Sequence, residues 1–449
     1  MKADAKKRRI IIVIAAIAAV AVVTGAVLLG IWLGTRVDVL ALTGMQTYYP
    51  PSESYVTVDR GFDYYLGHPD LVYFKGKLIT AYPLGHGKGQ IAMKTSSDLG
   101  KTWDPIDETE LPESFKYSQE TPTLYKLEFT DGTEKVLLVS GCPSWSDDDE
   151  YYANGFNFSL SDDGVNYTEF QNAYGVEWAN SMPDRGDPLY DSYPEDELPN
   201  FDESGKVLPY DVIVAMSSLT RLRDENGNYI DKWMGTFHDY DFYNYVSYLT
   251  FDDNGLPQWS VPKKFLSAQR EVEATADLCE LEVYRAPEGE LILLGRSNSR
   301  TMNSLISVSY DEGRTWSALK ELPYCLTGDR HKAEYDPISG KMLVSFRLYL
   351  PKVKPHALSR YTETGGYWVA WCGTPSDLLD YATDPTKDRS APFGDKLLVL
   401  GKTNDGLSDC GYAGLQIIDG TAISVSYGKF DSNAKYPYII AVNIDMSAL

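Results

Sequence analysis

The chain has 449 residues and a formal net charge of −23, from 41 Lys and Arg against 64 Asp and Glu. Nucleic-acid surfaces need Lys and Arg to replace the counterions of the phosphates, so this charge excludes a nucleic-acid-binding protein of the basic-patch type. Disordered acidic chains are poor in aromatic residues, whereas this chain has 33 tyrosines. With 36 glycines and 24 prolines, we expect a folded protein rich in turns.

The N-terminus has the composition of a membrane anchor. Residues 1–9 carry five Lys or Arg and one acid, and residues 10–34 form an uncharged apolar run. As a helix with a rise of about 1.5 Å per residue, this run exceeds the ~30 Å hydrocarbon core, and it is longer than the apolar region of a cleaved signal peptide. We expect a cytoplasmic tail at 1–9, a transmembrane signal anchor at 10–34, a linker at 35–52 and an extracellular domain at 53–449.

Pairs of short strands joined by Gly-containing turns recur through the rest of the chain. Strand groups lie near residues 62–103, 120–167, 208–259, 278–316, 329–372 and 411–445. These repeats of about 40–50 residues, without a sustained helical period, predict an all-β chain that folds as a six-bladed β-propeller rather than as two β-sandwiches. Residues 55–58 would add the strand that closes the ring, and the proline-rich acidic stretch 170–207 predicts an insertion.

Two segments, 96–103 and 309–316, share the pattern Ser-x-Asp-x-Gly-x-Thr-Trp, and degenerate copies lie at 160–167 and 250–259. In this pattern the Asp can accept turn N–H groups, the Gly can adopt a positive φ, and the Trp can pack beneath the loop. The segments resemble the Asp-box, or BNR, repeat of the sialidase superfamily, where it is a structural element of a six-bladed propeller. The resemblance covers nearly the whole chain after the anchor, and it implies a glycoside hydrolase.

Three residues match positions of the sialidase active site. The resemblance implies that Glu280 is the catalytic glutamate, that Arg296 holds the substrate carboxylate and that Tyr412 is the nucleophile. A neutral phenol avoids the repulsion that a carboxylate nucleophile would meet at the anomeric carbon of sialic acid, and the glutamate takes its proton. Arg330 and Arg347 are the candidates for the third arginine that would bind the substrate.

The chain departs from the sialidase pattern at two positions. Gly67 stands where the first arginine is expected, and residues 82–90, where the acid/base aspartate is expected, contain no acid. Histidines stand nearby, and imidazole titrates near neutral pH and suits proton transfer. We therefore take His86 and Asp70 as further candidate catalytic residues. The further candidate substrate contacts are His68, Lys88 and His331.

Three functions remain open from the sequence. The first is a membrane-anchored, extracellular, sialidase-like glycoside hydrolase that acts on glycans, anionic sugars included. The others are a non-catalytic propeller that binds glycans or proteins, and a polysaccharide lyase that uses His and Tyr. No Cys-x-x-Cys, His-x-His or His-x-x-x-His spacing occurs, so the sequence predicts no metal and no cofactor. We expect a monomer with a glycan substrate.

Overall fold

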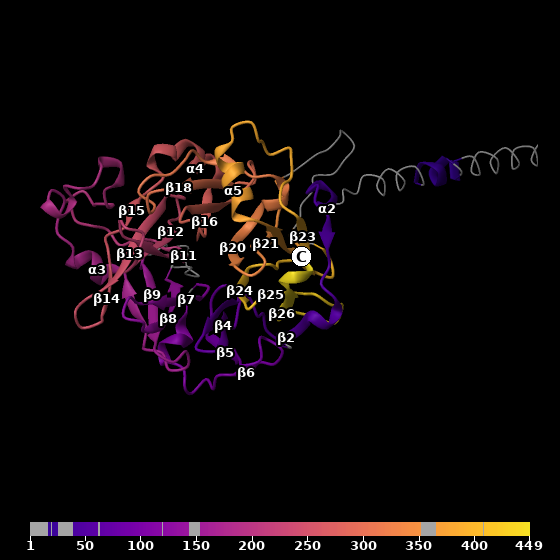
Figure 1. The fold of residues 1–449 in the computed structure, drawn as a ribbon, viewed down its shortest axis with the longest axis horizontal. Coiled ribbons are helices and arrows are strands. Elements are labelled where there is room, and N and C mark those ends of the chain that lie inside the picture. Colours follow the sequence, from indigo (N-terminus) through magenta and orange to yellow (C-terminus); the bar gives the residue numbers. More distant parts are fainter. Residues whose placement is uncertain are drawn as a thin grey trace, which may run out of the picture.

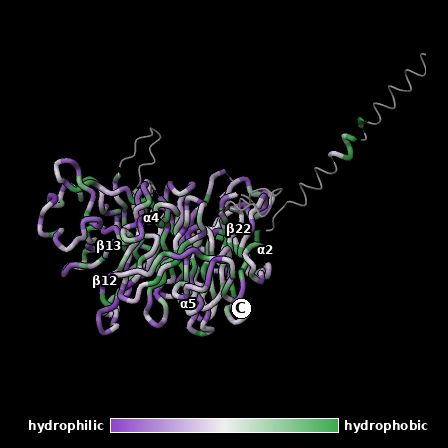
Figure 2. Tube along the Cα trace, turned by 90° about the horizontal axis from the view of Figure 1, so that it is seen from above, coloured by the Kyte–Doolittle hydropathy of each residue, from purple (hydrophilic) through white to green (hydrophobic). Residues whose placement is uncertain are grey.

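A computed structural model of the chain describes residues 17–18, 20–25, 39–61, 63–118, 120–142, 153–351, 365–406 and 408–449. Six β-sheets follow one another around a ring in the order of the sequence (Figure 1). When the molecule is turned by 90° and seen from above, the ring is a flattened body with a lobe at one side (Figure 2). The predicted six-bladed β-propeller is therefore confirmed.

Each blade is an antiparallel sheet that runs outward from the axis. Blade one holds β3 (Asp70–Phe74), β4 (Lys77–Pro83), β5 (Ile91–Ser96) and β6 (Asp104–Pro105). Blade two holds β7 (Thr123–Glu128), β8 (Glu134–Gly141), β9 (Phe156–Ser161) and β10 (Gln171–Ala173). Blade three holds β11 (Ile213–Arg223), β12 (Tyr229–His238), β13 (Asn244–Phe251), β14 (Pro257–Trp259) and β15 (Lys263–Lys264).

The second half of the chain repeats this arrangement. Blade four holds β16 (Leu278–Arg285), β17 (Leu291–Ser297), β18 (Leu305–Ser309) and β19 (Lys320–Glu321). Blade five holds β20 (Gly328–Asp336), β21 (Lys341–Leu348), β22 (Tyr367–Gly373) and β23 (Lys396–Lys402). Blade six holds β24 (Ala413–Ile418), β25 (Thr421–Gly428) and β26 (Tyr438–Asp445).

The first strand of each blade lies at the axis, where β3, β7, β11, β16, β20 and β24 contact one another in turn. Strand β2 (Tyr55–Asp59) pairs antiparallel with β26, with Tyr55 opposite Val442. This pairing joins the beginning of the domain to its last blade, so the ring closes as the sequence predicted. Middle strands such as β17 and β22 are apolar and buried on both faces, because a neighbouring blade covers each face.

Residues ahead of β2 also belong to the folded unit. Helix α2 (Val39–Leu42) places Leu40 in the apolar core between blades four and five, and β1 (Thr47–Tyr48) pairs in parallel with β23. Part of the segment expected to be a linker therefore packs against the propeller. The sequence pattern did not place Leu40 in the core, but burial of this apolar side chain holds the segment there.

Helices and short turns connect the strands. The predicted insertion contains α3 (Val176–Ser181) and two 3₁₀ helices (Pro188–Tyr190 and Glu195–Glu197), and α4 (Arg270–Ala276) and α5 (Pro375–Thr383) lie in later connections. Further 3₁₀ turns are Ser52–Ser54, Glu113–Tyr117, Ser267–Gln269, Tyr324–Leu326 and Met446–Ala448. All five cysteines are buried and none forms a disulfide bond.

The Ser-x-Asp-x-Gly-x-Thr-Trp loops fasten neighbouring blades together. In the loop of blade four, Asp311 accepts hydrogen bonds from the Thr315 amide (2.8 Å) and hydroxyl (2.7 Å). Gly313 has a φ of 78°, and a Cβ atom there would lie 2.7 Å from the Met234 sulfur on β12 of blade three. The equivalent Gly100 and Gly164 approach Ile423 of blade six and Ile79 of blade one in the same way. Each of these three loops thus packs on the second strand of the preceding blade.

The predicted tail at 1–9 and most of the predicted anchor at 10–34 lie outside the described residues. Of that stretch, residues 17–18 and 20–25 are described, and they are helical. Within the described ranges, no helix is long and apolar enough to cross a membrane.

Candidate active site

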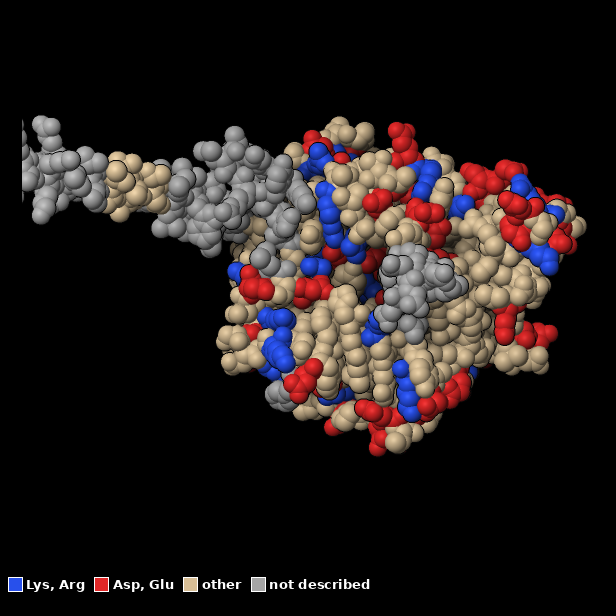
Figure 3. Space-filling model, turned by 180° about the vertical axis from the view of Figure 1, so that it is seen from behind, with Lys and Arg blue, Asp and Glu red and all other residues tan. Residues whose placement is uncertain are grey.

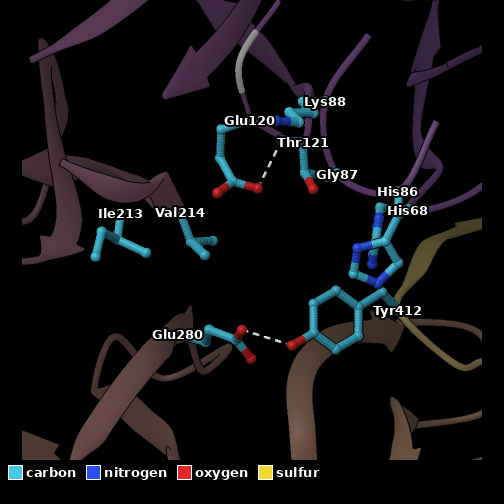
Figure 4. A pocket seen from close by; sticks show the side chains of 10 residues that line it. All are labelled: His68, His86, Gly87, Lys88, Glu120, Thr121, Ile213, Val214, Glu280 and Tyr412. Carbon is cyan, nitrogen blue, oxygen red and sulfur yellow. Dashed lines mark hydrogen bonds between the residues drawn. The ribbon is translucent and has the colours of Figure 1, made fainter. Parts of the chain in front are cut away.

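A cavity of about 470 Å³ opens at the mouth of the propeller where the innermost strands begin. Five blades contribute to its walls, and Figure 4 shows the lining side chains pointing toward a common space. The lining residues are His68, His86, Gly87, Lys88, Glu120, Thr121, Ile213, Val214, Glu280 and Tyr412. Blades one, four and six therefore bring together five of the predicted residues: His68, His86, Lys88, Glu280 and Tyr412.

Backbone irregularities aim several of these side chains. His68, Val214, Glu280 and Arg330 have φ values of 57°, 49°, 50° and 43°, in the left-handed region that residues other than Gly adopt at a cost. One extra residue on β16, between Cys279 and Glu282, shifts the register with β17, and β20 has the same irregularity. Such bulges turn a side chain out of the sheet, here toward the mouth of the channel.

Tyr412, Glu280 and Arg296 form a hydrogen-bonded group at one side of the cavity. The Tyr412 hydroxyl donates to Glu280 Oε1 at 2.6 Å, and Arg296 Nη1 donates to the same oxygen at 2.8 Å and to the Tyr412 hydroxyl at 2.5 Å. Glu280 is 5% exposed, and its second oxygen, Oε2, has no hydrogen-bond partner. Burial, together with the charge of Glu280, raises the pKa of Tyr412 well above its usual value.

Glu120 lies opposite Glu280, as Figure 4 shows, and the sequence analysis missed it. Glu120 is 8% exposed and accepts a hydrogen bond from the Thr121 amide at 2.8 Å. Burial raises the pKa of its carboxyl group above the ordinary glutamate value. The sequence carried one signal for it: like Glu280, Glu120 is a polar residue close to the start of an innermost strand.

The arginines beside the cavity are held by a buried carboxylate. Asp329 is 0% exposed, and its carboxylate accepts hydrogen bonds from Arg300 Nη1 at 2.5 Å and from Arg300 Nη2 at 2.9 Å. The same carboxylate lies 3.3 Å from Arg296 Nε and 3.7 Å from Arg347 Nη1. Burial opposes ionisation of Asp329, but the charges of Arg296 and Arg300 outweigh it, and the pKa of Asp329 is lowered. Arg296 and Arg347, expected to bind a substrate carboxylate, thus already face one from within the protein.

Arg330 has a different environment in the channel just below the cavity. Its Nη2 donates to the Thr123 hydroxyl at 2.8 Å, Nη1 has no partner, and the guanidinium lies 5.7 Å from the centre of the Tyr412 ring. Asp70 is also in the channel, where it accepts the Leu124 amide at 2.9 Å and lies 3.8 Å from Lys332. Asp70 does not line the cavity, because the backbone amide and the lysine engage its carboxylate inside the channel.

Two histidines and an aspartate form a third group, at the wall made by blades one and six. His86 Nε2 lies 3.2 Å from Asp409 Oδ2, and the ring of His68 lies 4.9 Å from that of His86. His68 and Asp409 also lie close enough to His86 for the three side chains to hold one metal ion. Sequence spacing could not reveal this, since the three residues come from segments far apart in the chain.

His331, which the sequence suggested as a substrate contact, is buried and does not line the cavity. It is 1% exposed, one ring nitrogen bonds to the Leu326 carbonyl at 3.0 Å, and the ring packs 5.1 Å from Phe346. Its side chain follows Arg330 on β20 but does not line the cavity. A second cavity of about 500 Å³ on the other side of Glu280 is lined by His238 and Arg296, so space is present on both sides of the glutamate.

No protein-family model matches the chain, and no curated protein matches it. Among solved structures, a Dyadobacter fermentans protein of unknown function is similar over 87% of this chain and 97% of its own, with a TM-score of 0.53 and 18% identity. The α-L-arabinofuranosidase of Fusarium graminearum, solved with arabinobiose, is similar over 88% and 99%, with a TM-score of 0.53 and 12% identity. The α-L-arabinanase of Penicillium chrysogenum, also solved with arabinobiose, is similar over 88% and 98%, with a TM-score of 0.51 and 14% identity. At these identities, what this chain shares with them is the propeller fold.

Proposed function

We propose that the protein is a glycoside hydrolase that works at the cavity between Glu280 and Glu120. The observation that carries the proposal is the Tyr412–Glu280–Arg296 group facing a second, buried glutamate. Two carboxyl groups on either side of a sugar-sized space are what glycosidic bond cleavage requires. The missing sialidase aspartate therefore has a replacement from another blade. Arabinobiose-bound relatives in fold are consistent with a glycan as substrate.

The environments of the two glutamates assign their roles. Glu120, whose pKa is raised by burial, gives a proton to the glycosidic oxygen. Glu280 Oε2 attacks the anomeric carbon as the carbon–oxygen bond to the leaving group breaks. Tyr412 and Arg296 hold Oε1 and so orient the attacking oxygen. Water then gives a proton to the Glu120 carboxylate, attacks the same carbon, and releases the sugar and Glu280.

The substrate in this proposal is a neutral sugar rather than sialic acid or a uronic acid. The Asp329 carboxylate is hydrogen-bonded to Arg300 and lies against Arg296 and Arg347. Arg347 also forms a salt bridge with Asp409 at 2.6 Å. A substrate carboxylate would have to compete with the buried carboxylate of Asp329 and the partly buried one of Asp409, which belong to the protein and cannot leave. For a neutral sugar, the electrostatic reason for a tyrosine nucleophile no longer applies, and a glutamate can attack.

The test is hydrolysis of aryl glycosides of neutral sugars, sialic acid and uronic acids, followed by trapping with the fluorinated analogue of the sugar that is cleaved. We expect turnover of a neutral sugar and a covalent label on Glu280. Glu120→Gln should lose about 10²–10⁴-fold in rate, and Tyr412→Phe about 10²-fold. Glu282→Gln, two residues along the same strand and facing the other end of the channel, is the matched control and should retain activity.

Other outcomes would identify the alternatives. A label on Tyr412, with turnover of sialosides, would make the protein a sialidase and would overturn the neutral-sugar assignment. Unsaturated products absorbing in the ultraviolet would indicate a polysaccharide lyase. Binding of glycans without turnover by any preparation would indicate a binding protein.

The proposal places this domain outside the cell as a monomer, held to the membrane by residues 10–34. Its support is the uncharged apolar run that follows the basic residues 1–9.

A further inference from the structure

His68, His86 and Asp409 bring one ligand atom each within 4.8 Å of the others. His68 precedes β3, His86 lies in the loop between β4 and β5, and Asp409 precedes β24. His86 Nε2 and Asp409 Oδ2 are 3.2 Å apart. This is close to the ~3.3 Å edge of a tetrahedron of ligands at about 2.0 Å from a zinc ion.

His68 is the residue that points to a ligand. It is 6% exposed, and its Nδ1 atom is buried without a hydrogen-bond partner. A neutral imidazole has one ring N–H and one nitrogen lone pair, and that lone pair can coordinate a metal. An unpartnered buried nitrogen is costly in a folded protein, and coordination of a cation would remove that cost.

The surroundings hold the other parts of the group in place. The Tyr427 and Tyr65 hydroxyls donate to Asp409 Oδ2 at 2.8 and 3.0 Å, and Arg347 binds Oδ1 at 2.6 Å. The His68 ring packs 4.6 Å from the Tyr427 ring. Hydrogen bonds of this kind around a ligating carboxylate fix its orientation, as they do in metalloprotein sites.

We propose that His68, His86 and Asp409 bind a divalent transition-metal ion of the zinc class at the wall of the cavity. Two imidazoles and one carboxylate favour zinc over calcium or magnesium, which prefer oxygen ligands alone. Three protein ligands leave a fourth position for water or a substrate oxygen, and His68 and His86 both line the cavity. The His86 side chain is 66% exposed, so the ion has a route from solvent.

The test is titration of the full chain, purified without a polyhistidine tag and freed of metal by a chelator, with Zn²⁺ by calorimetry and with Co²⁺ by visible absorption. We expect one ion per chain and the visible bands of tetrahedral cobalt. His86→Ala should weaken binding by about 10- to 100-fold or more. Lys88→Ala, an exposed change in the same loop and the same cavity wall, is the matched control and should bind as the wild type does.

Asp409→Asn is a second variant for the same metal titration, and circular dichroism shows whether this variant folds. His86→Ala remains decisive if Asp409→Asn does not fold, because the exposed His86 side chain adds little to the core. Failure of the wild type to bind Zn²⁺, or equal weakening by Lys88→Ala and His86→Ala, would overturn the proposal. Neither readout depends on hydrolysis of any glycan, so this result is independent of the proposed enzyme activity.

Discussion

Single residues at this site differ in what surrounds them, and that difference separates their chemistry. The Glu280 carboxylate is bound by a phenol and a guanidinium, whereas the Glu120 carboxylate accepts a hydrogen bond from the Thr121 amide. Two carboxyl groups in one cavity with unlike surroundings can serve as a nucleophile and as an acid. The four residues with positive φ at this mouth cost about 1–3 kcal/mol each, so part of the stability of the fold is spent on aiming side chains.

A pH profile tests the role of Glu120. Because burial raises its pKa, Glu120 stays protonated above the usual glutamate range, and kcat/KM should fall as pH rises through that raised pKa. In Glu120→Gln this alkaline limb should disappear, and activity should recover on aryl glycosides whose leaving groups need no proton. Initial rates across the pH range with good and poor leaving groups measure both effects. An unchanged alkaline limb in Glu120→Gln would assign the acid to another residue.

At the scale of strands and loops, two features stand out: the loops that hold neighbouring blades together, and the side chains that the innermost strands place in the channel. The loops at Gly100, Gly164 and Gly313 each pack on the preceding blade, so they stabilise contacts between blades as well as their own turns. Along the axis, the innermost strands place the side chains of Glu282 and Lys332 together in the channel.

Replacing glycine by alanine tests the contact between blades. Gly313→Ala and Gly76→Ala both put a side chain at a φ near 80°, which costs about 1–2 kcal/mol. At Gly313 the new Cβ would also meet the buried Met234 sulfur, adding about 1–3 kcal/mol, whereas nothing lies within 4 Å at Gly76. Urea unfolding of the two variants measures the difference. An equal loss of unfolding free energy in the two variants would mean that the loop at Gly313 does not stabilise the contact with blade three.

The channel acid Glu282 predicts how stability depends on pH. Burial raises its pKa to about 7, so between the ordinary glutamate pKa and pH 7 the native protein holds a proton that the unfolded chain has lost. The free energy of unfolding therefore falls as pH rises through this range, by on the order of 3 kcal/mol. In Glu282→Gln this part of the fall should be absent. Urea unfolding at pH 5 and pH 8 checks it, and an identical fall in both proteins would contradict the assignment.

At the scale of the whole molecule, ring closure and charge set the behaviour of the domain. Pairing of β2 with β26 joins the beginning and end of the propeller, so both ends of the domain are needed to complete blade six. Acidic side chains are prominent around the edge of the face in Figure 3, in keeping with the net charge of −23. An acidic domain is repelled by anionic lipid head groups, so attachment to a membrane would depend on residues 10–34 alone.

The membrane proposal has a direct test in the apolar run. Ile17→Lys with Val22→Lys places two charges in the segment, each costing about 2.5–3.5 kcal/mol at the centre of a bilayer. We expect the wild-type chain to stay with membranes after an alkaline carbonate wash and the double variant to be released. Ile338→Lys, at an apolar side chain of the propeller that is 71% exposed, is the control and should stay with the membrane. Release of the wild type would remove the anchor from the proposal.

The sequence by itself determined the all-β class, the six blades and the strand that closes the ring. These follow from local patterns, since alternating strands, Gly turns and the Ser-x-Asp-x-Gly-x-Thr-Trp loops are each written within a few residues. From the motifs that resemble those of sialidases, the sequence also predicted Tyr412, Glu280 and Arg296 as site residues, and the structure brings these three side chains into contact.

Only the tertiary structure decided what these residues face. Asp329 and Asp409 carry no local pattern that marks them, and the only signal for Glu120 is its place near the start of an innermost strand. All three residues matter because the ring brings different blades to one mouth. Asp329 lies against Arg296 and Arg347, which the sequence assigned to a substrate. Asp409 is more than 300 residues along the chain from His68 and His86, yet its side chain lies beside theirs. His331 and Asp70 drop out of the cavity wall for the same reason. A side chain's charge is set by the sequence, but its partners are set by which strands the propeller makes neighbours.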